Sequence, residues 1–278
     1  MSFIIGKKQK QRLIESYGSF KGQFEMVRET AERMLSNMDL SKNGEYYFKR
    51  EFKEFGYVHF KVTYKVSTAL DVNVYGASEG SNGEYFLSLS IFYDQRLHNK
   101  YKGNLTFTLA HEILHNLQRL QKKPIKGSNG KSGNIYQNVL KFRDGTQSEL
   151  VQTFFNAIYY CNPMEISANA SAVSNYLDVD PPKTFDYREC LKILPKIDAY
   201  QRYNEFLETF KYADSNSFST EDKNYIKSCL TSNGIYSPDN FNTDSYINKT
   251  IKMIRRNSQY AINKMERNIM NYLDVDNR

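Results

Sequence analysis

Two histidines four residues apart, with a glutamate directly after the first, are the residues of this chain best suited to metal chemistry. They lie in the segment His111-Glu112-Ile113-Leu114-His115, which has the spacing H-E-x-x-H. Residues four apart share one face of a helix, so both imidazoles can bind one ion. Glu112 projects beside them, where it can act on a metal-bound water. The spacing predicts a zinc hydrolase centre with two nitrogen ligands and an open coordination position.

An apolar helix is predicted to position these two histidines. Leucine and isoleucine recur at helical spacing through the segment, at Leu105, Leu109, Ile113, Leu117 and Leu120. Such a stripe buries one side of a helix, and the two histidines fall outside it. The alternative is a pair of partly buried, hydrogen-bonded histidines on an ordinary helix without a metal. The helical context favours the metal centre.

The third metal ligand is predicted to be a carboxylate further along the chain. Of the four histidines only His59 and His98 remain, and both precede the motif. A second helix is predicted to begin at Pro163, because proline suits the first turn of a helix. Glu165 and Asn169 are four apart on this helix and share a face. Glu165 is therefore the predicted ligand; the alternative is a surface glutamate favoured by the helix dipole.

These motifs resemble those of a known group of enzymes. H-E-x-x-H followed by a helix with E-x-x-x-N resembles the gluzincin branch of zinc metallopeptidases, of which thermolysin is the familiar member. The run from Glu165 to Asn169, followed by Ala172, is also similar to the E-x-x-A-N-x-x-A pattern of ImmA/IrrE-type peptidases. The resemblance covers roughly residues 55–175 and rests on motifs alone.

The resemblance implies a role for each motif residue. Zinc is the implied cofactor, His111, His115 and Glu165 are its implied ligands, and Glu112 is the implied catalytic base. Asn169 would accept a hydrogen bond from the ring nitrogen of His111 that does not face the metal. Thermolysin-like gluzincins have aspartate there, and an asparagine oxygen can still accept, although it lends the histidine less basicity.

The flanking sequence predicts an α+β, zincin-like fold with a small, mostly antiparallel sheet. Alternation of apolar and polar residues predicts strands at 59–66 and 85–93, with a shorter strand at 71–75 and a turn-rich connection at 76–83. The strand Tyr85–Tyr93 is the candidate edge on which an extended peptide substrate could pair. A purely structural role for this strand is the alternative.

Three regions are predicted along the chain. Residues 1–54 are polar and mostly helical, residues 55–178 carry the metallopeptidase core, and residues 183–278 form a helical region packed on that core. In the last region, Thr243 to Leu273 predicts one or two long helices.

Composition limits the setting in which the chain works. No apolar run approaches the roughly 18 residues of a membrane span. The apolar stretch at the N-terminus is too short for a secretory signal. Three cysteines without a close pair indicate free thiols in a reducing compartment. These features predict a cytoplasmic protein without a membrane partner; association with a virion is also compatible with them. The net charge of +7 leaves a nucleic-acid partner open, although no helix-turn-helix, ribonucleoprotein or KH signature supports one.

Two functions follow from the sequence. The first is a zinc-dependent peptidase that acts on a protein or peptide substrate, with the metal and Glu112 activating water. The second is a zincin-fold binding or assembly module, virion- or phage-associated, with weak or no catalysis. The intact Glu112 favours the first, because a structural zinc site needs no base. Tyr159, Tyr160 and His98 are candidates for stabilising the oxyanion, on proximity in the chain alone. The sequence identifies neither the substrate nor the oligomeric state.

Overall fold

The computed structural model describes residues 26–39, 41–52, 56–66, 73–81, 84–93, 106–115, 117, 131–179 and 186–276. This part of the chain is mostly helical, with one small sheet. The chain forms two compact units. The first comprises Met1–Leu120 and Asp178–Asp180, and the second comprises Gln121–Leu177 and Pro181–Arg278. The region boundaries predicted near residues 54 and 183 stay predictions.

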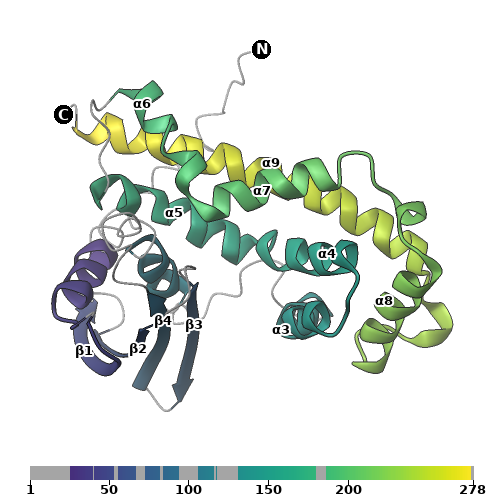
Figure 1. Cartoon of the computed structure of the whole chain (residues 1–278), viewed down its shortest axis with the longest axis horizontal. Helices are drawn as coiled ribbons and strands as arrows, with labels where there is room; N and C mark the ends of the chain where they lie inside the picture. The colour runs from purple at the N-terminus through teal and green to yellow at the C-terminus, as the bar shows by residue number, and fades with distance from the viewer. Residues whose placement is uncertain are drawn as a thin grey trace. The chain divides into compact units, whose positions relative to one another are not determined.

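The first unit contains a four-stranded sheet, drawn in dark blue in Figure 1. Its strands are β1 (Gly44–Phe52), β2 (Gly56–Val66), β3 (Asn73–Ser81) and β4 (Glu84–Tyr93). Their order across the sheet is β1-β2-β4-β3. The pairs β1–β2 and β3–β4 are antiparallel and the pair β2–β4 is parallel. Two of three pairings are thus antiparallel, in agreement with the predicted small, mostly antiparallel sheet.

Strand β1 corrects the prediction that residues 1–54 are mostly helical. Residues 26–36 do form a helix, but β1 pairs with β2 along its whole length, from Gly44 opposite Tyr64 to Phe52 opposite Gly56. Its residues alternate in burial, as in a strand with one covered face. Aromatic side chains at alternate positions fit such a pleated surface, and this local preference outweighed the general polarity of the region.

Strand β4 corrects the predicted substrate edge. It pairs with β2 on one side and β3 on the other, so its backbone hydrogen bonds are committed within the sheet. The edges of the sheet are β1 and β3, and only an edge strand can accept an added strand. The connection predicted at 76–83 is also wrong over most of its length, because β3 continues to Ser81. Gly76 and Gly80 lie within this paired strand.

Strand β2 and the helix over residues 26–36 both contribute to the core of the first unit. Val58, Phe60, Val62 and Tyr64 alternate along β2, and each is at most 1% exposed. Full burial of such a side chain stabilises a fold by about 1.5–3 kcal/mol. The helix buries apolar side chains on one face, namely Val27, Ala31 and Met34. An ion pair of 2.6 Å between Arg50 and Glu29 joins this helix to β1.

The second unit is a group of helices around a long C-terminal helix. They are α3 (Lys131–Asp144), α4 (Glu149–Tyr160), α5 (Pro163–Val179), α6 (Tyr187–Leu191), α7 (Asp198–Thr209), α8 (Thr220–Ser232) and α9 (Thr243–Asp276), with short 3-10 turns η2 (Leu194–Lys196), η3 (Ser215–Ser217) and η4 (Pro238–Asn240). The 34-residue α9 runs beside α7 (Figure 1). It confirms the long helix predicted from Thr243. None of the described helices is long and apolar enough to cross a membrane.

Phe154 on α4 centres the aromatic core of this unit. Its ring contacts those of Phe210, Phe218 and Tyr246, with centroids 5.4–6.4 Å apart and steep interplanar angles. Edge-to-face contacts of this kind add about 0.5–1.5 kcal/mol each to the burial of the rings. They join α4 to the segment after α7 and to the first turns of α9.

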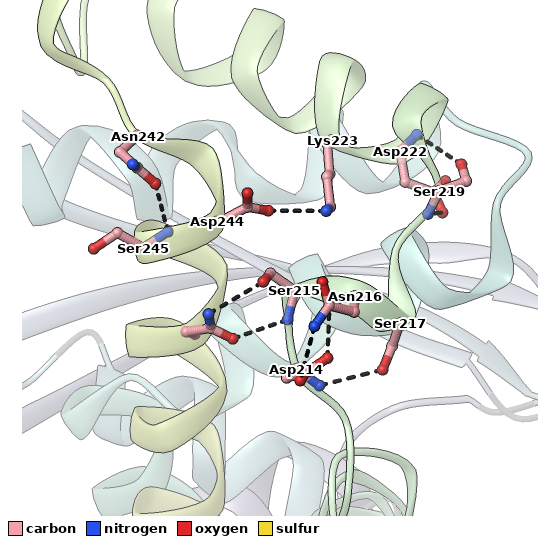
Figure 2. A network of polar contacts seen from close by, with 11 residues as sticks. Asp214, Ser215, Asn216, Ser217, Ser219, Asp222, Lys223, Asn242, Asp244 and Ser245 are labelled. Atoms are coloured by element: carbon pink, nitrogen blue, oxygen red, sulfur yellow. Dashed lines mark hydrogen bonds and ion pairs between the residues drawn. The ribbon is translucent and has the colours of Figure 1, made fainter.

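A polar network holds the start of α9, as Figure 2 shows. The Asn242 side chain accepts the backbone N–H of Ser245 at 2.8 Å, which satisfies a donor of the first turn of α9. Lys223 on α8 forms an ion pair of 2.9 Å with Asp244. Ser219 begins α8 with a capping box. These contacts fix α8 against the N-terminal end of α9.

Candidate metal centre

The helix that carries the two histidines forms as predicted. Residues 106–115 are helical, and Leu109, Ile113 and Leu117 are at most 2% exposed. Leu105 and Leu120, the ends of the predicted stripe, lie outside the described residues. Four-residue spacing places His111 and His115 one turn apart, with ring centroids 4.4 Å from each other. The pair is buried, at 8% and 5% exposure.

Helix α5 begins at Pro163, as the sequence predicts, and it presents Glu165 and Asn169. The Asn162 side chain caps it by accepting the backbone N–H of Met164 at 3.0 Å. Proline costs no hydrogen bond at this first position. Glu165 is 6% exposed, so it is not the surface glutamate of the alternative interpretation. Asn169, on the same face of α5, is 3% exposed.

Three side chains of α9 anchor α5. Asn257 donates to the carbonyl of Cys161 at 3.0 Å, just before α5 begins. Lys264 donates to the hydroxyl of Ser167 at 2.8 Å, and Asn268 donates to the carbonyl of Ala170 at 2.5 Å. The donors are 7 and 4 residues apart, so they share one face of α9. They fix both the position and the rotation of α5, and therefore the direction of Glu165.

His111, His115 and Glu165 form a buried group that could hold a metal ion. One ligand atom from each, two ring nitrogens and a carboxylate oxygen, all lie within 4.8 Å of one another. Among the described residues no other group of three histidine, cysteine or acidic side chains meets this condition. His111 Nδ1 and His115 Nε2 are buried ring nitrogens that accept or donate no hydrogen bond within the described residues, although both residues make other interactions.

The donor set and its burial fit a divalent transition metal. Two imidazoles and one carboxylate are the ligands that catalytic zinc sites use. A cation bound here would also stabilise the buried carboxylate of Glu165. Glu112 lies beside the group: its Oε1 is 3.9 Å from His111 Nε2, and its side chain is 17% exposed. It can therefore reach both the group and water.

Asn169 makes a contact that the sequence did not predict. Its side-chain N–H donates to the Tyr203 hydroxyl at 3.0 Å. That hydroxyl in turn donates to the carbonyl of Tyr160 at 3.0 Å. The predicted hydrogen bond from His111 to the Asn169 oxygen stays a prediction. Tyr203 follows Asn169 by 34 residues, and no local signal in the sequence marks it.

Tyr160 is one of the two adjacent tyrosines named as oxyanion candidates. It ends α4, and burial raises the pKa of its hydroxyl. The guanidinium of Arg202, 4.9 Å from the ring centroid, opposes this rise in pKa, and the Glu165 carboxylate adds to it. Tyr160 therefore lies within electrostatic reach of a predicted ligand. His98, the third candidate, lies outside the described residues.

Cys161 is no part of the metal group, although it lies only four residues before Glu165. Its Sγ is 3.3 Å from Ser258 Oγ and 3.7 Å from the carbonyl oxygen of Ile254, both on α9. Burial raises the pKa of this thiol to about 12. Cys161 is thus a packed, protonated thiol.

The comparisons with known proteins add no relative. No protein-family model matches the chain, and no curated protein or solved structure is significantly similar to it. The buried His-His-Glu group and the residues around it are therefore the features of the chain that indicate its function.

Proposed function

We propose that the chain is a zinc-dependent peptidase in which His111, His115 and Glu165 bind the metal. The observation that carries the proposal is the separation of their ligand atoms, within 4.8 Å of one another. Ligands of one tetrahedral zinc lie about 3.3 Å apart, so side-chain movements of at most about 1.5 Å would complete the site. We also propose that the chain has a zincin-like fold and that it is a gluzincin-type peptidase.

Each residue then has a defined task. Zinc in this position would polarise a peptide carbonyl and make a bound water more acidic. Glu112 accepts the proton of the attacking water and passes it to the leaving amine. A carboxylate next to the ligands, rather than among them, suits this work because it stays available for the proton. Asn169 accepts a hydrogen bond from His111 and so holds the ring in the orientation that binding requires.

Metal analysis and one substitution test the proposal. The purified chain should contain one zinc, and Glu112→Gln should retain it while losing roughly 100- to 10,000-fold in peptide hydrolysis, because an amide cannot accept the proton. Glu149→Gln, at an exposed first-turn position of α4, is the matched control and should keep both properties.

The outcomes separate the alternatives. A chain that binds no zinc refutes the site, and a Glu112→Gln variant that cleaves as fast as the parent refutes the role of Glu112. A parent that binds zinc but cleaves nothing in a broad peptide library supports the binding or assembly module instead.

A further inference from the structure

We infer that Tyr203 is a positioning residue, whose hydroxyl fixes the Asn169 amide so that the amide oxygen is the end left to accept a hydrogen bond from the metal-binding histidine. The inference rests on the proposed function, and it names a residue that the motifs do not contain. Tyr203 lies on α7 and is 0% exposed.

The Tyr203 hydroxyl has a single hydrogen to donate. That hydrogen is donated to the carbonyl oxygen of Tyr160 at 3.0 Å. A carbonyl oxygen can only accept, so the Tyr203 hydroxyl must be the donor of this bond. The Tyr203 oxygen can then only accept from its other neighbour. Asn169 meets it at 3.0 Å with its N–H group.

The Tyr203 hydroxyl stays protonated near neutral pH, and this keeps the direction of both hydrogen bonds. Burial raises the pKa of Tyr203 well above its ordinary value, the bond from Asn169 lowers it somewhat, and the nearby Glu165 raises it further. The hydroxyl therefore keeps its hydrogen, and the direction of both bonds is fixed.

Orientation matters because the two ends of an asparagine amide are chemically different. Only the oxygen can accept from a ring N–H, whereas the NH₂ group can only donate. A reversed amide would face the ring N–H with a second donor, or would favour the tautomer that protonates the metal-facing nitrogen. Aspartate would not have this problem, since either of its oxygens accepts. A chain with asparagine at position 169 therefore needs a partner that selects one orientation, and Tyr203 is placed to do so.

A double-mutant cycle on zinc affinity tests the inference. The four proteins are the parent, Tyr203→Phe, Asn169→Asp and the double variant, each titrated with zinc against a chromophoric chelator at fixed pH. In the asparagine background, Tyr203→Phe should weaken zinc binding by at least about threefold. The upper limit is the roughly 10- to 100-fold loss expected when the Asn169 oxygen no longer accepts from the histidine. In the aspartate background the Tyr203 hydroxyl would turn and donate to the carboxylate. The same change should then alter affinity by less than about twofold, because a carboxylate has no wrong orientation.

Tyr225→Phe is the matched control. Its hydroxyl also donates to a backbone carbonyl, that of Phe142 at 2.7 Å, and its loss should leave zinc affinity unchanged. Circular dichroism of the metal-free proteins verifies that each variant is folded. An equal loss in both backgrounds, or no loss in the asparagine background, overturns the role of Tyr203 while leaving the zinc site standing. A parent that binds no zinc removes the proposed function, and this inference with it.

Discussion

The imidazole rings of His111 and His115 stand edge to face, with their centroids 4.4 Å apart and their planes at 84°. The rings come from successive turns of one helix, which holds them in this arrangement. Glu112 directly follows His111 in the sequence. Both rings are buried, and one nitrogen of each lies within 4.8 Å of a Glu165 carboxylate oxygen. A metal bound to these atoms would therefore be buried in the protein. Metal binding and stability should therefore be coupled.

Zinc should raise the thermal stability of the parent. A ligand at 100 times its dissociation constant stabilises the folded state by about 2.7 kcal/mol, provided that it does not bind the unfolded chain. Differential scanning calorimetry with zinc and then with excess chelator measures this shift. His115→Ala should show no zinc-dependent shift, whereas His59→Ala, on β2 of the sheet, should respond like the parent. The same response in His115→Ala would mean that zinc binds elsewhere.

Substitution of Asn169 should change zinc affinity according to the acceptor that remains. Asn169→Ala removes the oxygen and should weaken binding by roughly 10- to 100-fold. Asn169→Asp keeps an acceptor and makes His111 a better donor to the metal, so it should bind zinc as tightly as the parent or tighter. Isothermal titration at one pH compares the three. Equal affinities would show that Asn169 serves only the packing of α5.

The thiol of Cys161 should be inert in the folded protein. With a pKa of about 12 it has almost no thiolate at pH 7.5, and it is fully buried. Alkylation followed by peptide mass spectrometry should therefore label the half-buried Cys229 first and Cys161 only after unfolding. Cys161→Ala should bind zinc like the parent. Rapid labelling of Cys161 in the native state would contradict the packing against α9.

Lys264 should make stability rise with pH in the alkaline range. Burial lowers the pKa of its amine below 10.5, and Arg267 adds to this effect. Between the lowered pKa and 10.5 the unfolded chain binds more protons than the folded chain, so the free energy of unfolding increases with pH. Urea unfolding from pH 8 to 10.5 should show the parent gaining stability relative to Lys264→Met. A constant difference between the two proteins would refute the shift.

Local spacing was enough to predict the separate parts of the candidate site. The four-residue interval of His111 and His115 and the start of α5 at Pro163 depend on helix geometry, which each segment specifies for itself. The same holds for the long helix from Thr243, whose apolar residues recur at helical spacing. The nature of the donors, two imidazoles and a carboxylate, was likewise readable as metal chemistry.

Tertiary structure decided what local spacing cannot encode. The parallel pairing of β2 with β4 places β3, and not β4, at the edge of the sheet. The contact between Asn169 and Tyr203 joins residues 34 positions apart, and the anchoring of α5 by α9 spans almost 100. Such contacts arise only when helices and strands pack, because the burial that favours them depends on surfaces brought together from distant parts of the chain. The sequence therefore determined which side chains could bind a metal, and packing decided how they are held.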